Sequence, residues 1–140
     1  MNETVKDLIG VDSDKLAEEA VKLLLEKKAQ NVKMYYVADS TSVTDYYINA
    51  TGRSSTHVGS LADEVDVLIS ERGRQPLRVE GRAGNAWILV DFGDVIVNVF
   101  DRQSRDFYDF DRLLPKESER SIEKLVEEVD NKLKINTAKE

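Results

Sequence analysis

Two apolar segments joined by a short turn constrain the fold of this chain more than any other feature. Residues 86–92 (AWILVDF) and 94–100 (DVIVNVF) are rich in β-branched and aromatic side chains, and Gly93 and Asp94 form a two-residue turn between them. Such a turn favours a type I′ or II′ hairpin. Apolar residues lie on both faces of each segment, as in the interior strands of a sheet. The sequence therefore predicts an antiparallel strand pair inside a sheet that is covered by other elements.

The remaining segments alternate between helix and strand patterns. Apolar spacings of three and four predict a helix from about Ser13, another from Ser54 or Ser55, and a last amphipathic helix with the stripe Ile122–Leu133. The order α-β-β-α-β-β-β-α indicates an α+β fold (an α/β sandwich) with a single mixed β-sheet of about five strands and packed helices. The other predicted strands are 32–38, 45–51 and 77–80, and the segment 101–114 is a short helix or irregular.

The same patterns divide the chain into three regions. Residues 1–12 are expected to form a flexible N-terminal tail, 13–114 a single domain, and 115–140 a C-terminal amphipathic helix with a frayed end. The apolar stripe of the last helix can pack on the domain or pair with another copy, so a homodimer is possible.

Composition narrows the classes of function. The chain has 140 residues, no cysteine, and one histidine, His57, which excludes disulfides, thiolate catalysis and multi-histidine metal sites. The net charge of −7 argues against nucleic-acid binding through a broad basic surface and favours a basic protein as partner. No apolar run approaches the roughly 20 residues of a membrane helix, and the first ten residues do not resemble a signal peptide. We therefore expect a cytoplasmic protein that does not enter membranes or bind nucleic acid sequence-specifically.

Acidic pairs raise the alternative of a nucleotide-binding or nucleotidyltransferase-type enzyme. Metal-dependent nucleotidyl transfer needs carboxylates that converge on phosphate oxygens. Gly59-Ser60, a dipeptide that such enzymes place ahead of their acidic pair, falls inside a predicted helix. We therefore expect no metal, no cofactor and no catalytic residue here. The candidate pairs are Asp91 with Asp94, Asp63 with Asp66, and Asp109 with Asp111.

Three smaller motifs have simpler explanations. Asp91-Phe92-Gly93 matches the magnesium-binding triplet of protein kinases, but a hairpin turn explains it, because glycine supplies a positive φ. The turn at residues 52–55 leads from a strand into a helix and could bind an anion, although it lacks the lysine of a phosphate-binding loop. His57 lies in the first turn of that helix, and no nucleophile with an orienting acid accompanies it.

Trp87 and Asn98 leave one question about the sheet open. Trp87 shares a face with Leu89 and Asp91, and Asn98 lies among valines on the next strand. An unpaired amide in a buried strand costs on the order of 1–3 kcal/mol. Either this face is partly open and suited to protein recognition, or Trp87 is core and Asn98 is hydrogen-bonded internally.

Four segments together resemble the ribosomal silencing factor family, also called Iojap-like. They are residues 44–58 (TDYYINATGRSSTHV), 76–81 (PLRVEG), 87–100 (WILVDFGDVIVNVF) and 105–113 (RDFYDFDRL). The resemblance implies a fold related to nucleotidyltransferases but without their catalytic residues. It also implies a translation repressor that binds the large ribosomal subunit through large-subunit ribosomal protein fourteen and blocks subunit joining sterically. A role in ribosome biogenesis is associated with organelle members.

On this interpretation an acidic module meets a basic ribosomal protein, and aromatic side chains hold the contact. The chain departs from the resemblance at Asn98, where the family often has histidine. The partner-binding residues that we expect are Trp87, Asp91, Phe92, Asp94, Asn98, Tyr108 and Asp109, with Arg78 and Glu80 beside them.

Overall fold

The computed structural model describes residues 6–138, which form one mixed sheet with helices on both faces. In chain order the elements are α1 (Ser13–Glu26), β1 (Gln30–Tyr36), β2 (Tyr46–Gly52), α2 (Ser55–Glu71), β3 (Arg78–Glu80), β4 (Trp87–Asp91), β5 (Val95–Asp101), α3 (Arg102–Tyr108), the 3₁₀ turns η1 (Phe110–Leu113) and η2 (Lys116–Ser118), β6 (Glu119–Arg120) and α4 (Glu123–Ala138). The α+β class and the single mixed sheet are confirmed, with six strands rather than about five.

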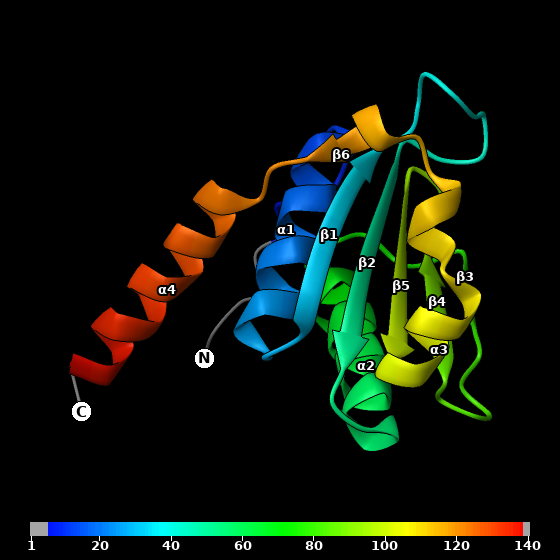
Figure 1. Ribbon diagram of the computed structural model, residues 1–140. Helices are drawn as coiled ribbons and strands as arrows, with labels where there is room; N and C mark the ends of the chain where they lie inside the picture. The colour runs from blue at the N-terminus through cyan, green and yellow to red at the C-terminus, as the bar shows by residue number, and fades with distance from the viewer. Residues whose placement is uncertain (1–5, 139–140) are drawn as a thin grey trace.

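The strand order across the sheet is β3-β4-β5-β2-β1-β6 (Figure 1). Strands β2 and β5 are parallel neighbours, and the other pairs are antiparallel. The predicted hairpin is present, since Phe92 N–H donates to the Val95 carbonyl at 2.9 Å and Gly93 has a φ of 95°. A positive φ at only the first central residue is the type II′ form of this turn. Local turn chemistry therefore set this part of the sheet correctly.

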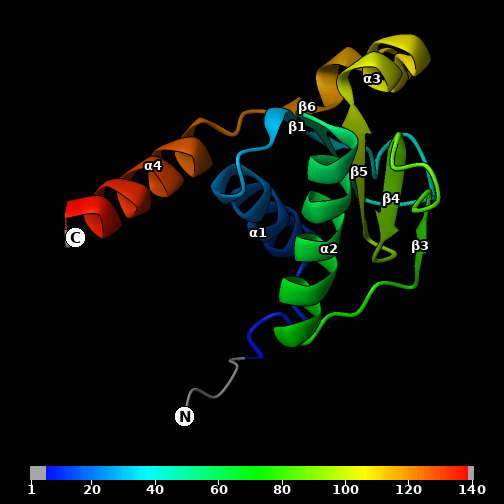
Figure 2. The same cartoon turned by 90° about the horizontal axis from the view of Figure 1, so that it is seen from below.

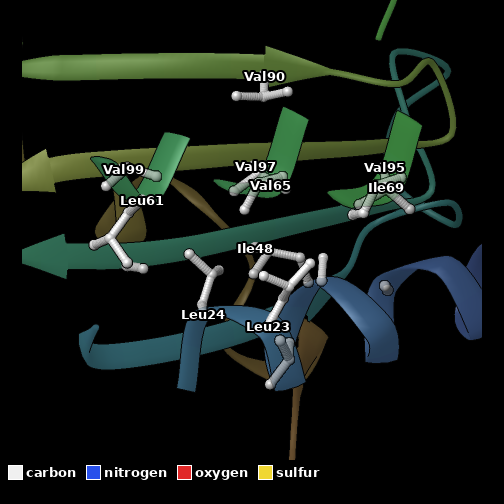
Figure 3. Packing of buried hydrophobic residues seen from close by; sticks show 14 of the residues in the cluster. Leu23, Leu24, Ile48, Leu61, Val65, Ile69, Val90, Val95, Val97 and Val99 are labelled. Atoms are coloured by element: carbon white, nitrogen blue, oxygen red, sulfur yellow. The ribbon is translucent and has the colours of Figure 1, made fainter. Parts of the chain in front are cut away.

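Helices α1 and α2 cover one face of the sheet, and α3 lies on the other (Figure 2). Figure 3 shows the main core between α1, α2 and the sheet, where Leu24, Val65 and Val97 point toward one another. All three side chains have no exposed surface. Burying one such side chain contributes about 1.5–3 kcal/mol, so this layer supplies most of the stability.

The described part of the expected tail, residues 6–12, packs against the end of α2. Leu8 is fully buried, its N–H donates to the Arg72 carbonyl at 3.0 Å, and Arg72 Nη2 lies 2.6 Å from Asp7 Oδ2. The folded domain therefore begins before Ser13, because one buried leucine and one ion pair hold this segment. The rest of the expected tail, residues 1–5, lies outside the described residues.

The C-terminal region adds a strand and a helix to the domain. The short strand β6 pairs with β1 at Met34 and Tyr35, a contact too brief to leave a sequence pattern. Helix α4 packs against α1, with Leu125 8% and Val129 3% exposed. The apolar stripe is thus used within the chain, which removes the surface on which the homodimer expectation depended. No helix within residues 6–138 combines the length and apolar character needed to cross a membrane.

Candidate protein-binding surface

The sheet face opposite α1 and α2 is only partly covered, by α3 and η1. Strand alternation places Trp87 and Leu89 of β4 on this face, next to Phe100 and Asn98 of β5. Trp87 and Leu89 are half-buried, whereas Ile88 and Val90 on the other face are fully buried. The face therefore reaches solvent at its β4 edge.

Aromatic side chains from the sheet and from the α3–η1 segment gather around Trp87. Its ring centroid lies 5.1 Å from that of Tyr108 and 5.8 Å from that of Phe110, with Phe100 beneath it at 4.8 Å. Phe107 is 79% exposed and Tyr108 53% exposed. We call the group that reaches solvent the aromatic surface; its members are Tyr47, Trp87, Phe107, Tyr108 and Phe110.

A buried ion pair holds the α3–η1 segment on the sheet. Arg105 is 7% exposed, and its guanidinium donates to both carboxylate oxygens of Asp111 at 2.9 Å. It also donates to the Asn31 carbonyl at 2.8 Å and to Thr51 Oγ1 at 3.0 Å. Burial would raise the pKa of Asp111, but hydrogen bonds from Arg105 and Tyr35 lower it below its ordinary value. The segment that carries Tyr108 is therefore anchored to β1 and β2.

Asn98 is buried, at 1% exposure, and it orients Trp87. Its Oδ1 accepts from Trp87 Nε1 at 3.0 Å, and its Nδ2 donates to Asn49 Oδ1 at 3.0 Å. Both sequence alternatives hold in part, because Asn98 is hydrogen-bonded internally while the Trp87 ring remains half-exposed. Asn98 has no surface to offer a partner, so its expected contribution to binding becomes an indirect one, through Trp87.

Arg78, Glu80 and Asp91 form a charged edge beside the aromatic surface. Asp91 accepts from Arg78 Nε at 3.0 Å and from the Gly93 N–H at 2.8 Å, and Arg78 also contacts Glu80. The hydrogen bond to Asp91 is the main cause that raises the pKa of Arg78. The Asp91 carboxylate is thus already neutralised, while Arg78 and Glu80 remain exposed.

Phe92 and Asp94 lie near the hairpin turn rather than at the aromatic surface. Phe92 is 4% exposed and belongs to the main core, because it faces the helix side of the sheet. Asp94 Oδ1 lies 2.6 Å from Arg74 Nη2, which anchors the chain after α2. As the molecule stands, Phe92 offers no contact to a partner and Asp94 offers a paired carboxylate.

Asp109 is exposed at the junction of α3 and η1 and has a φ of 50°. This left-handed residue ends α3 and turns the chain, which brings Phe110 back toward the sheet. Among the expected site residues, the structure brings together Trp87, Tyr108 and Asp109. The sequence also missed Phe107, Phe110 and Leu113 as surface residues, although the aromatic-rich segment 101–114 was a usable signal.

The features that suggested an enzyme are used structurally. Ser54 caps α2, and His57 accepts from the Arg53 N–H through Nδ1 at 2.9 Å and lies within 3.0 Å of the Lys27 carbonyl through Nε2. Asp63 and Asp66 both contact Arg82. Within residues 6–138, no group of three or more acidic or histidine side chains is placed to hold a metal ion.

This fold and this surface define a small α+β domain that presents aromatic side chains for protein recognition. Comparison with known proteins identifies the family. The family model described as "Ribosomal silencing factor during starvation" matches residues 11–140. The ribosomal silencing factor of Halalkalibacterium halodurans is 29% identical over 103 residues, which cover 74% of this chain and 88% of that protein.

A solved structure of a Chromobacterium violaceum protein superposes with a TM-score of 0.72 at 32% identity, covering 74% of this chain and 86% of that one. A mouse protein named for mitochondrial assembly of the ribosomal large subunit is 24% identical over 110 residues, covering 76% of this chain and 47% of its own length. The chain therefore belongs to the ribosomal silencing factor family, a non-catalytic family of ribosome regulators.

Proposed function

We propose that this protein binds the large ribosomal subunit through large-subunit ribosomal protein fourteen and sterically blocks joining of the small subunit. Translation is repressed because a bound copy occupies the surface where the subunits meet. Family membership supports ribosome association. The aromatic surface is the observation in this structure that best supports a protein partner, since Phe107 and Tyr108 are 79% and 53% exposed on an anchored segment.

The physical chemistry of this surface suits a tight contact with a basic protein. Tryptophan and tyrosine are enriched among the residues that dominate interface energies. Trp87 is fixed by Asn98, and Tyr108 is fixed by the anchoring of α3, so little side-chain freedom is lost on binding. The net charge of −7 and the exposed Asp109 favour encounter with a positively charged partner.

The test is to add the purified protein to separated subunits and to measure their association by light scattering. We expect the wild-type protein to suppress joining in proportion to its occupancy of the large subunit. Truncation of an interface hot spot costs about 2 kcal/mol or more, so Tyr108→Ala should weaken binding by roughly 30-fold.

Val67→Ala provides a matched control, since Val67 is 52% exposed on α2, behind the sheet. It should suppress joining as well as the wild-type protein does. Undiminished joining at saturating wild-type protein would refute the proposal. Equal effects of the two substitutions would refute the assignment of the aromatic surface.

A further inference from the structure

The sheet edge at which β2 and β5 end gathers basic side chains from three parts of the chain. The two strands are parallel, and their last pair is Gly52 with Asp101, so Arg53 and Arg102 follow neighbouring strands at the same edge. Gln30, at the start of β1, pairs with Thr51, which brings the preceding Lys28 to this edge. Figure 1 shows the ends of β2 and β5 and the starts of β1 and α3 at this edge.

Side-chain contacts confirm that these segments lie together. Arg102 Nη2 donates to Gln30 Oε1 at 3.3 Å, which links the start of α3 to the start of β1. His57 Nε2 lies 3.0 Å from the Lys27 carbonyl, which links the start of α2 to the end of α1. We call Lys28, Arg53 and Arg102 the basic edge.

The basic edge is unusual for this acidic chain because its cations lack carboxylate partners. Within residues 6–138, most arginines form ion pairs with Asp or Glu, namely Arg72, Arg74, Arg78, Arg82, Arg105 and Arg112. In the same described range, Lys28, Arg53 and Arg102 are exposed and form no such pair.

Nearby charges do not cancel the basic edge. Lys27 is also there, 3.6 Å from Glu64. The Asp101 carboxylate is engaged in capping α3, since its Oδ1 accepts from the Ser104 N–H at 2.7 Å. The local balance is therefore positive on a protein whose net charge is −7.

We propose that the basic edge contacts backbone phosphates of ribosomal RNA next to the protein partner on the large subunit. This inference rests on the proposed function. Arginine and lysine are the side chains that bind phosphate oxygens, and such contacts position a protein without reading sequence. Helix α3 connects the two surfaces: Arg102 is its first residue and Tyr108 its last, roughly 9 Å apart along the helix axis.

The contact is local and depends on the first one. The overall negative charge repels free RNA, so the basic edge alone binds RNA weakly. Once the aromatic surface is docked, a neighbouring RNA backbone is present at a high effective concentration. The phosphate contact then fixes the orientation of the bound protein and makes its affinity for the intact subunit sensitive to salt.

The test compares two triple variants with the wild-type protein. The first neutralises the basic edge by Lys28→Gln, Arg53→Gln and Arg102→Gln. The control neutralises three cations that also lack ion pairs in the described chain, by Lys116→Gln, Lys124→Gln and Lys134→Gln. Both variants change the net charge by the same amount. Thermal unfolding of each variant verifies that it is folded.

Binding is measured to intact large subunits and to isolated ribosomal protein fourteen, from about 50 to about 200 mM salt. Each lost phosphate contact lowers the slope of log affinity against log salt by about one. We expect the basic-edge variant to lose about two to three units of slope on the subunit, a roughly 10- to 40-fold smaller weakening over this salt range. It should bind the isolated protein like the wild type, and the control should keep the wild-type slope.

An unchanged slope for the basic-edge variant on the subunit, or an equal loss on the isolated protein, would overturn this inference and leave the proposed function standing. The second result would mean that the basic edge contacts protein. Absence of wild-type binding to the large subunit would instead overturn the proposed function, and this inference with it.

Discussion

Replacing Arg105 by methionine removes the cation that anchors the α3–η1 segment while keeping the length of the side chain. The wild-type guanidinium makes hydrogen bonds to Asp111, Asn31 and Thr51, all between 2.8 and 3.0 Å. Methionine can make none of them. Asp111 would keep only the bond from Tyr35, whose hydroxyl donates to Oδ2 at 2.7 Å.

The expected loss follows from burial. Breaking a buried ion pair by removing one partner costs about 3–5 kcal/mol, because the other charge stays in the protein without compensation. Arg105 is 7% exposed, but the Asp111 side chain is 22% exposed and water relieves part of the penalty. We therefore expect Arg105→Met to lower the free energy of unfolding by about 3 kcal/mol.

Urea unfolding followed by tryptophan fluorescence measures this loss, since Trp87 is the single tryptophan and lies against Tyr108 of the anchored segment. Arg112→Met is the control, because Arg112 is 84% exposed and 3.7 Å from its partner Asp109; it should cost at most about 0.5 kcal/mol. The double variant Arg105→Met with Asp111→Leu should regain at least about 1 kcal/mol, because no charge is left unpaired. A loss below about 1 kcal/mol for Arg105→Met would refute the anchoring argument.

Three further predictions concern other contacts. Asn98→Leu leaves the Trp87 Nε1–H without its acceptor and should cost about 1–3 kcal/mol in urea unfolding, with a shifted tryptophan emission; an unshifted emission would contradict the orienting role. Leu125→Ala should cost about 2–3 kcal/mol by the same assay, whereas Ile135→Ala, at 57% exposure, should cost less than about 0.5 kcal/mol; equal costs would mean that α4 does not pack as described. The bond to Arg72 lowers the pKa of Asp7 from 3.8 to about 2, so its contribution to stability is present above pH 3.8 and is lost as pH falls toward 2. Thermal unfolding should therefore depend less on pH in that window for Asp7→Asn, and an unaltered dependence would refute the contribution.

The elements predicted correctly are those with a local signal. The hairpin at Gly93 depends on neighbouring residues alone, and helix α2 carries a long apolar stripe that ends before Gly73. Strand β6 has two residues, so no alternation could identify it. The docking of residues 6–12 depends on Leu8 and on an ion pair that spans 65 positions, which no window along the chain detects.

The candidate site was predicted only in part for the same reason. The aromatic-rich segment 101–114 pointed to Tyr108 and Asp109, which are exposed. Phe92 was expected at the site because of its motif, but strand alternation turns it into the core. Asp91 and Asp94 looked like free acidic contacts, and the chain supplies each with its own arginine.

The sequence by itself determined the order of helices and strands, the faces that are apolar, and the family resemblance, because these depend on residue type and on spacings of a few positions. Only the tertiary structure decided which carboxylates are neutralised, which aromatic rings reach solvent, and which cations remain unpaired at the basic edge. Those properties depend on partners tens of residues apart, such as Arg105 with Asn31 or Tyr35 with Asp111. Folding chooses these partners through burial and hydrogen bonding, and no local pattern in the chain records the choice.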